Sequence, residues 1–213
     1  MKFDNPLVQK LNQIADWIIR IVMINFLVIL FSIPLVTMFN SFSSGYRLFH
    51  DYINKKNTKL FSGFFTYFKE YFKTRLMLGL FMTLFLVLGY LNVTYYVETL
   101  NQGAGLFYHL GYYVTISFLV GAYIVYLYLF PVSMVYPTMK FRLMIKLAFF
   151  VSGKFVIRTM LLIISTLVPF LLLFSSITSL IFVFAGVSLW LLIAVMITNE
   201  VTDYLERLGK KND

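Results

Sequence analysis

The sequence of 213 residues contains no cysteine and carries little charge for its length. The lack of cysteine excludes disulfide scaffolds, thiol nucleophiles, iron–sulfur clusters and Cys-ligated zinc. Charged residues make up 13% of the chain and apolar residues 60%, whereas about 25% and about 45–50% are usual in soluble domains. So few polar side chains cannot cover so much apolar surface, and the same excess argues against disorder. The composition therefore indicates an integral membrane protein.

Long stretches without charge predict where the chain crosses the membrane. Asp, Glu, Lys and Arg are absent from residues 21–46, 76–97, 99–139 and 159–199. A helix needs about 20 residues to cross roughly 30 Å of hydrocarbon, so the last stretch is long enough for two crossings and must turn back, at the serine-rich segment 175–179. We predict an all-α, polytopic transmembrane helix bundle that forms a single domain over residues 1–213. The expected crossings are 17–38, 76–97, 110–136, 159–175 and 179–199.

The distribution of lysine and arginine predicts the orientation. Basic residues gather in the segments 47–75 and 137–158 and in the C-terminal tail, where the sequence has Arg207, Lys210 and Lys211. The connections at 98–109 and 175–179 contain none. Because short cytoplasmic loops carry an excess of Lys and Arg, the basic segments and the C-terminus are expected in the cytoplasm.

The N-terminal region raises the question of a sixth element. Five crossings would place Lys2, Lys10 and Arg20 outside, against the charge rule. Pro34 removes a helix donor and can break the first segment. Residues 35–53 would then return across the membrane, or part of the way, as a short helix sheltered by protein because it is strongly polar. The sequence favours this return helix with both termini in the cytoplasm, and it leaves five or six crossings open.

An aromatic stripe predicts a helix on the membrane surface over residues 61–75. Five phenylalanines there are spaced i, i+3, i+4, i+7 and i+11, which places them on one helical face, and lysines flank them. Such a face suits the headgroup region over anionic lipid, and it could also dock onto a partner protein. The candidate partner-contact residues are Phe61, Phe64, Phe65, Phe68, Phe72, Lys69 and Lys73. A second basic amphipathic helix is expected over 138–158.

The apolar segments contain few groups that could do chemistry. Asn25 and Asn92 are expected to form interhelical hydrogen bonds, with a role as substrate ligands as the less favoured alternative. His50 and His109 fall on opposite sides of the membrane in the predicted topology, so they would not share a metal ion. Motifs of the H-E-x-x-H, G-x-S-x-G and Walker types do not occur. We therefore expect no enzymatic activity and no cofactor or metal. We also expect no nucleic-acid partner, because the positions of the basic residues are explained by the membrane topology.

Pairs of small residues are the remaining candidate contacts between helices. Ser117 and Gly121 are four residues apart, as are Ser175 and Ser179. Either pair could seat a helix of the same chain or of a partner.

Three short segments carry a resemblance to a known family. They are Ser32-Ile33-Pro34-Leu35-Val36-Thr37, Phe64-Phe65-Thr66-Tyr67-Phe68-Lys69-Glu70-Tyr71-Phe72-Lys73 and Tyr136-Pro137-Thr138-Met139-Lys140-Phe141. With them the chain resembles the YesL-like family (domain of unknown function 624), integral membrane proteins of Gram-positive bacteria. The second segment is similar to the F-x-x-F-K-x-N-F-K element of that family, with Tyr71 where asparagine is common.

The resemblance implies a role in transport without naming functional residues. Such proteins have no established activity and are often encoded beside carbohydrate ABC importers and glycan-degrading enzymes. The implied function is a non-enzymatic accessory or regulatory membrane subunit, in the cell membrane, whose partners are the permease or ATPase subunits of a carbohydrate ABC importer. The alternative function is a small solute-binding membrane subunit or a transporter in its own right. The sequence does not decide whether the protein forms a homo-oligomer.

Overall fold

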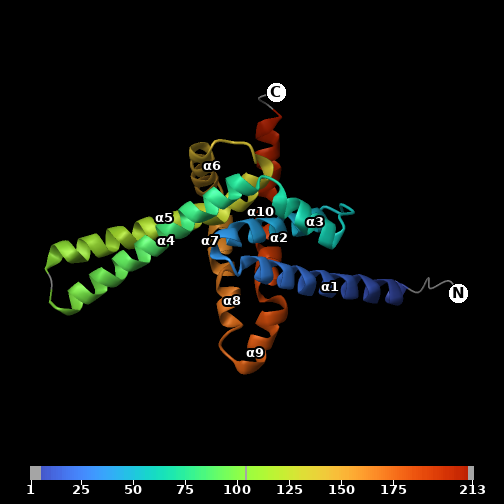
Figure 1. The fold of residues 1–213 in the computed structure, drawn as a ribbon, viewed down its shortest axis with the longest axis horizontal. Coiled ribbons are helices and arrows are strands. Elements are labelled where there is room, and N and C mark those ends of the chain that lie inside the picture. Colours follow the sequence, from blue (N-terminus) through green and yellow to red (C-terminus); the bar gives the residue numbers. More distant parts are fainter. Residues whose placement is uncertain (1–5, 104, 211–213) are drawn as a thin grey trace. The chain divides into compact units, whose positions relative to one another are not determined.

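The structure, a computed structural model, describes residues 6–103 and 105–210, apart from the side chains of Pro6 and Ile177. These residues form helices joined by short turns, and no strand occurs among them, which confirms the predicted all-α class (Figure 1). In chain order the elements are α1 (Pro6–Ser32), η1 (Leu35–Thr37), α2 (Met38–Ile53), α3 (Leu60–Lys69), α4 (Phe72–Asn101), α5 (Leu106–Val135), α6 (Phe141–Lys154), α7 (Val156–Ser165), α8 (Leu167–Leu171), α9 (Ser176–Ile181), η2 (Phe182–Gly186) and α10 (Val187–Gly209). Lys2 and Lys211, used above for the orientation, lie outside the described residues.

Several helices are long and apolar enough to cross a membrane. There are 4 such helices in the described part of the chain, at Leu7–Ser32, Phe72–Asn101, Leu106–Val135 and Thr178–Gly209. A bent pair, Phe141–Lys154 with Val156–Leu171, makes a fifth if its two parts form one span, and its bend is 102°. The polytopic helical architecture is thus confirmed, with 4 to 5 candidate spans.

The chain divides into two compact units. The first is Met1–Glu70 with Leu161–Asn199, and the second is Tyr71–Met160 with Glu200–Asp213. The single domain expected over 1–213 stays a prediction.

In the first unit α1 ends just before Pro34 and the chain returns along it as α2 (Figure 1). The residue before a proline avoids the α conformation, which explains why the crossing expected at 17–38 stops at Ser32. Most of α2 is buried, including the polar residues Asn40, Ser41, Ser43 and Ser44. The predicted return helix therefore exists and is sheltered by protein.

Close packing around Gly45 of α2 supports this return. A Cβ atom added to Gly45 would lie 2.8 Å from Val28 Cγ2 and 2.9 Å from Leu191 Cδ1, so any larger residue would force these side chains of α1 and α10 to shift. The Ser41 hydroxyl donates to the Val28 carbonyl at 2.9 Å, which satisfies a polar group inside the packed helices.

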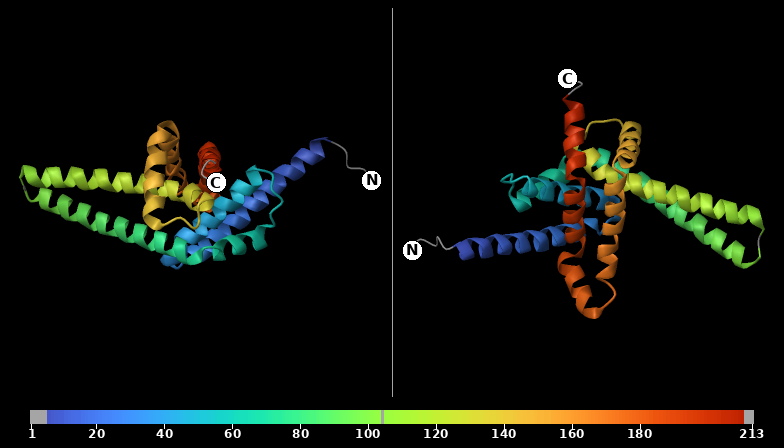
Figure 2. Two further views of the ribbon diagram at one scale, coloured as in Figure 1. Left: turned by 90° about the horizontal axis from the view of Figure 1, so that it is seen from above. Right: turned by 180° about the vertical axis from the view of Figure 1, so that it is seen from behind.

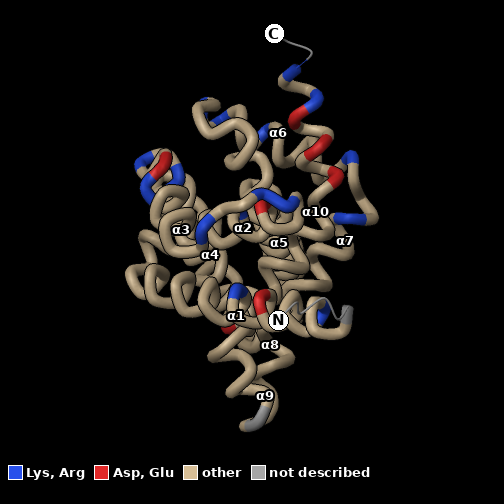
Figure 3. The backbone as a smooth tube through the Cα atoms, turned by 90° about the vertical axis from the view of Figure 1, so that its right-hand side faces the viewer, with Lys and Arg blue, Asp and Glu red and all other residues tan. Residues whose placement is uncertain are grey.

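The first unit also contains the reversal predicted at residues 175–179. The chain descends through α8 and comes back through η2 and α10, with α9 at the turn (Figure 2). Ser175 and Thr178 form a capping box at the start of α9, which satisfies free backbone donors there. Residues 159–199 carry no charged side chain, as Figure 3 shows for α8 and α9.

In the second unit α4 and α5 form an antiparallel hairpin, and α6 packs across the C-terminal half of α5 (Figure 2). Gly103 has φ +85° in the turn of the hairpin, a conformation that favours glycine. The ring of Phe81 in α4 contacts the ring of Phe141 in α6, with centroids 4.9 Å apart. The amphipathic helix expected over 138–158 is shorter, since α6 ends at Lys154 and the chain bends there.

Candidate functional site

A buried carboxylate joins α2 to α3 in the first unit. Asp51 lies in the last turn of α2 and is only 3% exposed. It accepts hydrogen bonds from the Tyr67 hydroxyl and from Thr58 Oγ1, the latter at 2.9 Å, and Lys56 Nζ lies 3.2 Å away. These donors come from the connection before α3 and from α3 itself. Asp51 therefore fixes α3 against α2.

The surroundings of Asp51 determine its charge. Burial on its own would raise the pKa of the carboxyl, but hydrogen bonds from Tyr67 and Thr58 and the Lys56 ammonium outweigh it and lower the pKa below 3.8. Burial and the neighbouring Asp51 carboxylate raise the pKa of Tyr67 above 10.0. At neutral pH the pair is therefore an ionised acceptor and a protonated donor.

A second group of contacts holds the C-terminal end of α3, where Tyr67 also bonds to Asp51. The Arg47 guanidinium lies over the Tyr67 ring, 4.1 Å from its centroid, and Arg47 Nη1 is 2.6 Å from Glu70 Oε2. Glu70 directly follows α3. Cation–π contacts and charge-assisted hydrogen bonds are among the stronger polar interactions. Helix α3 is thus held near both of its ends.

The aromatic stripe has a buried inner face and a partly exposed outer face on α3, and Phe65 of the outer face still contacts Phe31 of α1, with ring centroids 5.4 Å apart. Phe64 is fully buried, and Phe31 of α1 lies 5.8 Å from it and 5.2 Å from Phe68 between ring centroids. The expectation that Phe64 contacts a partner is therefore wrong, because the chain itself covers this side chain. Phe61 remains 51% exposed and Phe65 37%.

The stripe also does not continue into one helix. Helix α3 ends at Lys69, Glu70 is extended, and Tyr71 adopts a left-handed conformation with φ 53°. A residue in this region cannot continue a right-handed helix, so the single helix expected over 61–75 is wrong. Phe72 and the exposed Lys73 begin α4 in the second unit. We call Phe61, Phe65 and the exposed Lys69, which are spaced i, i+4 and i+8, the outer face of α3.

Asn25 forms the interhelical hydrogen bonds that the sequence predicts. Its Nδ2 donates to the Val183 carbonyl at 2.7 Å, and its Oδ1 accepts from the backbone N–H groups of Val187 and Ser188 at 3.0 Å each. These groups belong to the π-helical η2 and the start of α10. Asn25 thus joins α1 to the irregular turn at η2. Asn92 is exposed on α4, and its interhelical role stays a prediction.

The histidines take part in no metal cluster among the residues that the structure describes. Asn54 Nδ2 lies 3.1 Å from His50 Nε2 and donates to the His50 carbonyl at 2.9 Å, while His109 is exposed on α5. Within residues 6–103 and 105–210, no group of three His, Cys, Asp or Glu side chains could hold a metal ion. The polar contacts of Asp51 and Arg47 described above hold α3 in place.

The sequence reading missed Asp51, Tyr67, Thr58 and Arg47. One signal was present: Asp51 is the only acidic residue between Asp16 and Glu70, in a segment rich in lysine.

These helices, with a short amphipathic helix anchored by a buried carboxylate, define a polytopic helical membrane protein. Residues 21–93 match the model of the family described as "Protein of unknown function, DUF624". The match includes the break at Pro34, the whole of α2 and α3 and most of α4, and it agrees with the resemblance that the first two sequence motifs carry. No curated protein and no solved structure shows significant similarity to the chain.

Proposed function

We propose that the protein is a non-enzymatic accessory or regulatory membrane subunit that binds a carbohydrate ABC importer. The observation that carries the proposal is the outer face of α3. Phe61 and Phe65 are exposed beside the exposed Lys69 on a helix whose inner face and ends are held in place. Aromatic side chains on a rigid element are typical anchors of protein interfaces. The family resemblance supplies the class of partner.

We place the protein in the cell membrane of a Gram-positive bacterium, with α3 and both termini in the cytoplasm. The excess of Lys and Arg in residues 47–75 and in the C-terminal tail supports this orientation. In it the outer face of α3 meets the cytoplasmic surface of a permease or its ATPase.

Co-purification of partner subunits tests the proposal. The affinity-tagged chain is isolated in mild detergent from its own host, and associated proteins are identified by mass spectrometry. The double variant F61L/F65L keeps most of the apolar area and loses the ring-shaped contacts. We expect roughly 10-fold lower recovery of importer subunits, because aromatic anchors dominate many interfaces, with unchanged insertion into the membrane.

The chain offers a matched control. Phe107 and Phe170 are 88% and 63% exposed on other helices, so F107L/F170L makes the same chemical change away from α3 and should leave the recovery unchanged. Equal recovery from F61L/F65L and the wild type would contradict docking through α3. Unaltered sugar uptake in a deletion strain would contradict the accessory role itself.

A further inference from the structure

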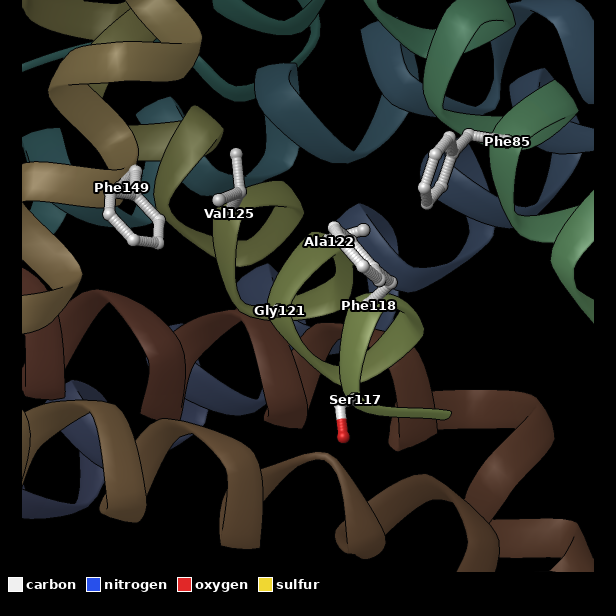
Figure 4. Close-up of a pocket in the computed structure, with 7 residues that line it drawn as sticks. All are labelled: Phe85, Ser117, Phe118, Gly121, Ala122, Val125 and Phe149. Atoms are coloured by element: carbon white, nitrogen blue, oxygen red, sulfur yellow. The ribbon is translucent and has the colours of Figure 1, made fainter. Parts of the chain in front are cut away.

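An open apolar pocket lies among α4, α5 and α6 of the second unit. Its volume is about 430 Å³, within the range of small-molecule sites. Figure 4 shows Phe85 of α4 and Phe149 of α6 on either side of the α5 residues. The pocket is lined by Phe85, Ser117, Phe118, Gly121, Ala122, Val125 and Phe149. We call it the α5 pocket.

The lining of the α5 pocket suits a hydrocarbon chain. Its one polar side chain, Ser117, donates its hydroxyl to the Tyr113 carbonyl at 2.8 Å, so it needs no hydrogen bond from a ligand. A Cβ atom added to Gly121 would meet no atom within 4 Å, which leaves open space above this part of α5. Helices α4 and α5 are candidate membrane spans, and α6 belongs to the bent pair that makes a fifth span if its two parts form one. Acyl chains surround such spans in a bilayer.

Cations lie on the face of α6 that leads to the pocket. Arg142, Lys146 and Phe149 are all exposed and are spaced i, i+4 and i+7, so they share one helical face. Lys146 precedes Phe149 by about 4.5 Å along the axis and Arg142 by about 10.5 Å. The ion pairs Arg47–Glu70, Lys56–Asp51 and Arg158–Glu200 involve neither of these cations.

We propose that the α5 pocket binds one anionic phospholipid, with an acyl chain against Phe85, Phe118 and Phe149 and the phosphate on Arg142 and Lys146. Charge complementarity selects this occupant. A basic cluster beside an apolar site between transmembrane helices is the arrangement that holds anionic headgroups. A zwitterionic lipid offers the same chains without the net negative charge, so it fills the pocket and gains less from the cations.

Native mass spectrometry of the full chain, delipidated and titrated with lipid, tests this site. The two probes are dioleoylphosphatidylglycerol and dioleoylphosphatidylcholine. We expect the wild type to bind the anionic lipid at least 10-fold more tightly. The variant R142Q/K146Q should lose roughly 5-fold in affinity for the anionic lipid for each cation removed, with little change for the zwitterionic lipid. The variant G121L fills the pocket and should weaken both lipids.

Two controls keep the result interpretable. R207Q/K210Q makes the same charge change at exposed residues near the end of α10 and should bind both lipids as the wild type does. Thermal unfolding shows whether each variant is folded, and A122L fills the same pocket if G121L is not. Equal affinities of the wild type for the two lipids, or undiminished binding of the anionic lipid by folded R142Q/K146Q, would overturn the proposal.

Discussion

At the scale of single residues, Asp51 fixes the position of α3 through its hydrogen bonds. A buried carboxylate costs free energy unless it is hydrogen-bonded and paired, and Asp51 receives bonds from Tyr67 and Thr58 as well as the charge of Lys56. The sequence shows that Asp51 is a lone acidic residue, but it cannot name the two hydroxyl donors. Their approach depends on how the connection between α2 and α3 folds back, which no local pattern specifies.

The Tyr67→Phe variant tests this anchor. It removes a hydrogen bond to an ionised acceptor, so we expect the free energy of unfolding at pH 7 to fall by about 1.5–3 kcal/mol. The hydrogen bonds lower the pKa of Asp51 from its ordinary value of 3.8. The ionised carboxylate therefore stabilises the folded protein at pH values above 3.8, and this stabilisation is lost as the pH falls through the lower pKa of Asp51 in the folded protein. Without Tyr67 that pKa rises, and the loss in acid begins at higher pH. Thermal unfolding in detergent across a pH series measures both effects.

The control is Tyr90→Phe, which removes a hydroxyl that is part of a side chain 69% exposed on α4. Its effect should stay within about 0.5 kcal/mol. A Tyr67→Phe protein as stable as the wild type at pH 7 would show that Asp51 does not hold α3.

At the scale of elements, the helical period predicted an amphipathic α3 but not its end. The spacing of the phenylalanines correctly put Phe64 and Phe68 on one face, and the structure shows that Phe31 covers this face. Helix α3 ends at Lys69, next to Glu70, which pairs with Arg47 23 residues earlier in the chain, and the left-handed Tyr71 follows. The stripe of hydrophobic residues continues through Tyr71 unchanged, so periodicity could not reveal the break.

The junction between α1 and η2 gives a prediction at the same scale. Asn25→Ala leaves the Val183 carbonyl and the N–H groups of Val187 and Ser188 without their partner in apolar surroundings. We expect the free energy of unfolding to fall by roughly 2 kcal/mol and hydrogen exchange to accelerate at the two N–H groups. Asn92→Ala, at an exposed site on α4, is the matched control and should change neither. Unchanged exchange in Asn25→Ala would show that the amide does not hold the π-helical segment.

At the scale of the whole molecule, composition and charge-free stretches were enough to predict the helical class and the presence of several helices apolar enough to cross a membrane. Pro34 was enough to predict the return of the chain through α2. The division into two compact units was not predictable, because it depends on contacts between residues such as Asn25 and Val183 that lie 158 positions apart. The α5 pocket depends likewise on three helices packed together.

We propose that α2 returns the chain across the membrane, so that the start of α1, helix α3 and the C-terminal tail share the cytoplasmic side. The chain has no cysteine, so single cysteines can be introduced at Lys10, Ser62, Gln102 and Lys210, which are all exposed. A membrane-impermeant maleimide added to intact cells should label only the Gln102→Cys protein, and the other three only after the membrane is opened. Labelling of Lys10→Cys in intact cells would mean that α2 does not return the chain across the membrane. Labelling of Ser62→Cys would place α3 outside and contradict its contact with a cytoplasmic partner.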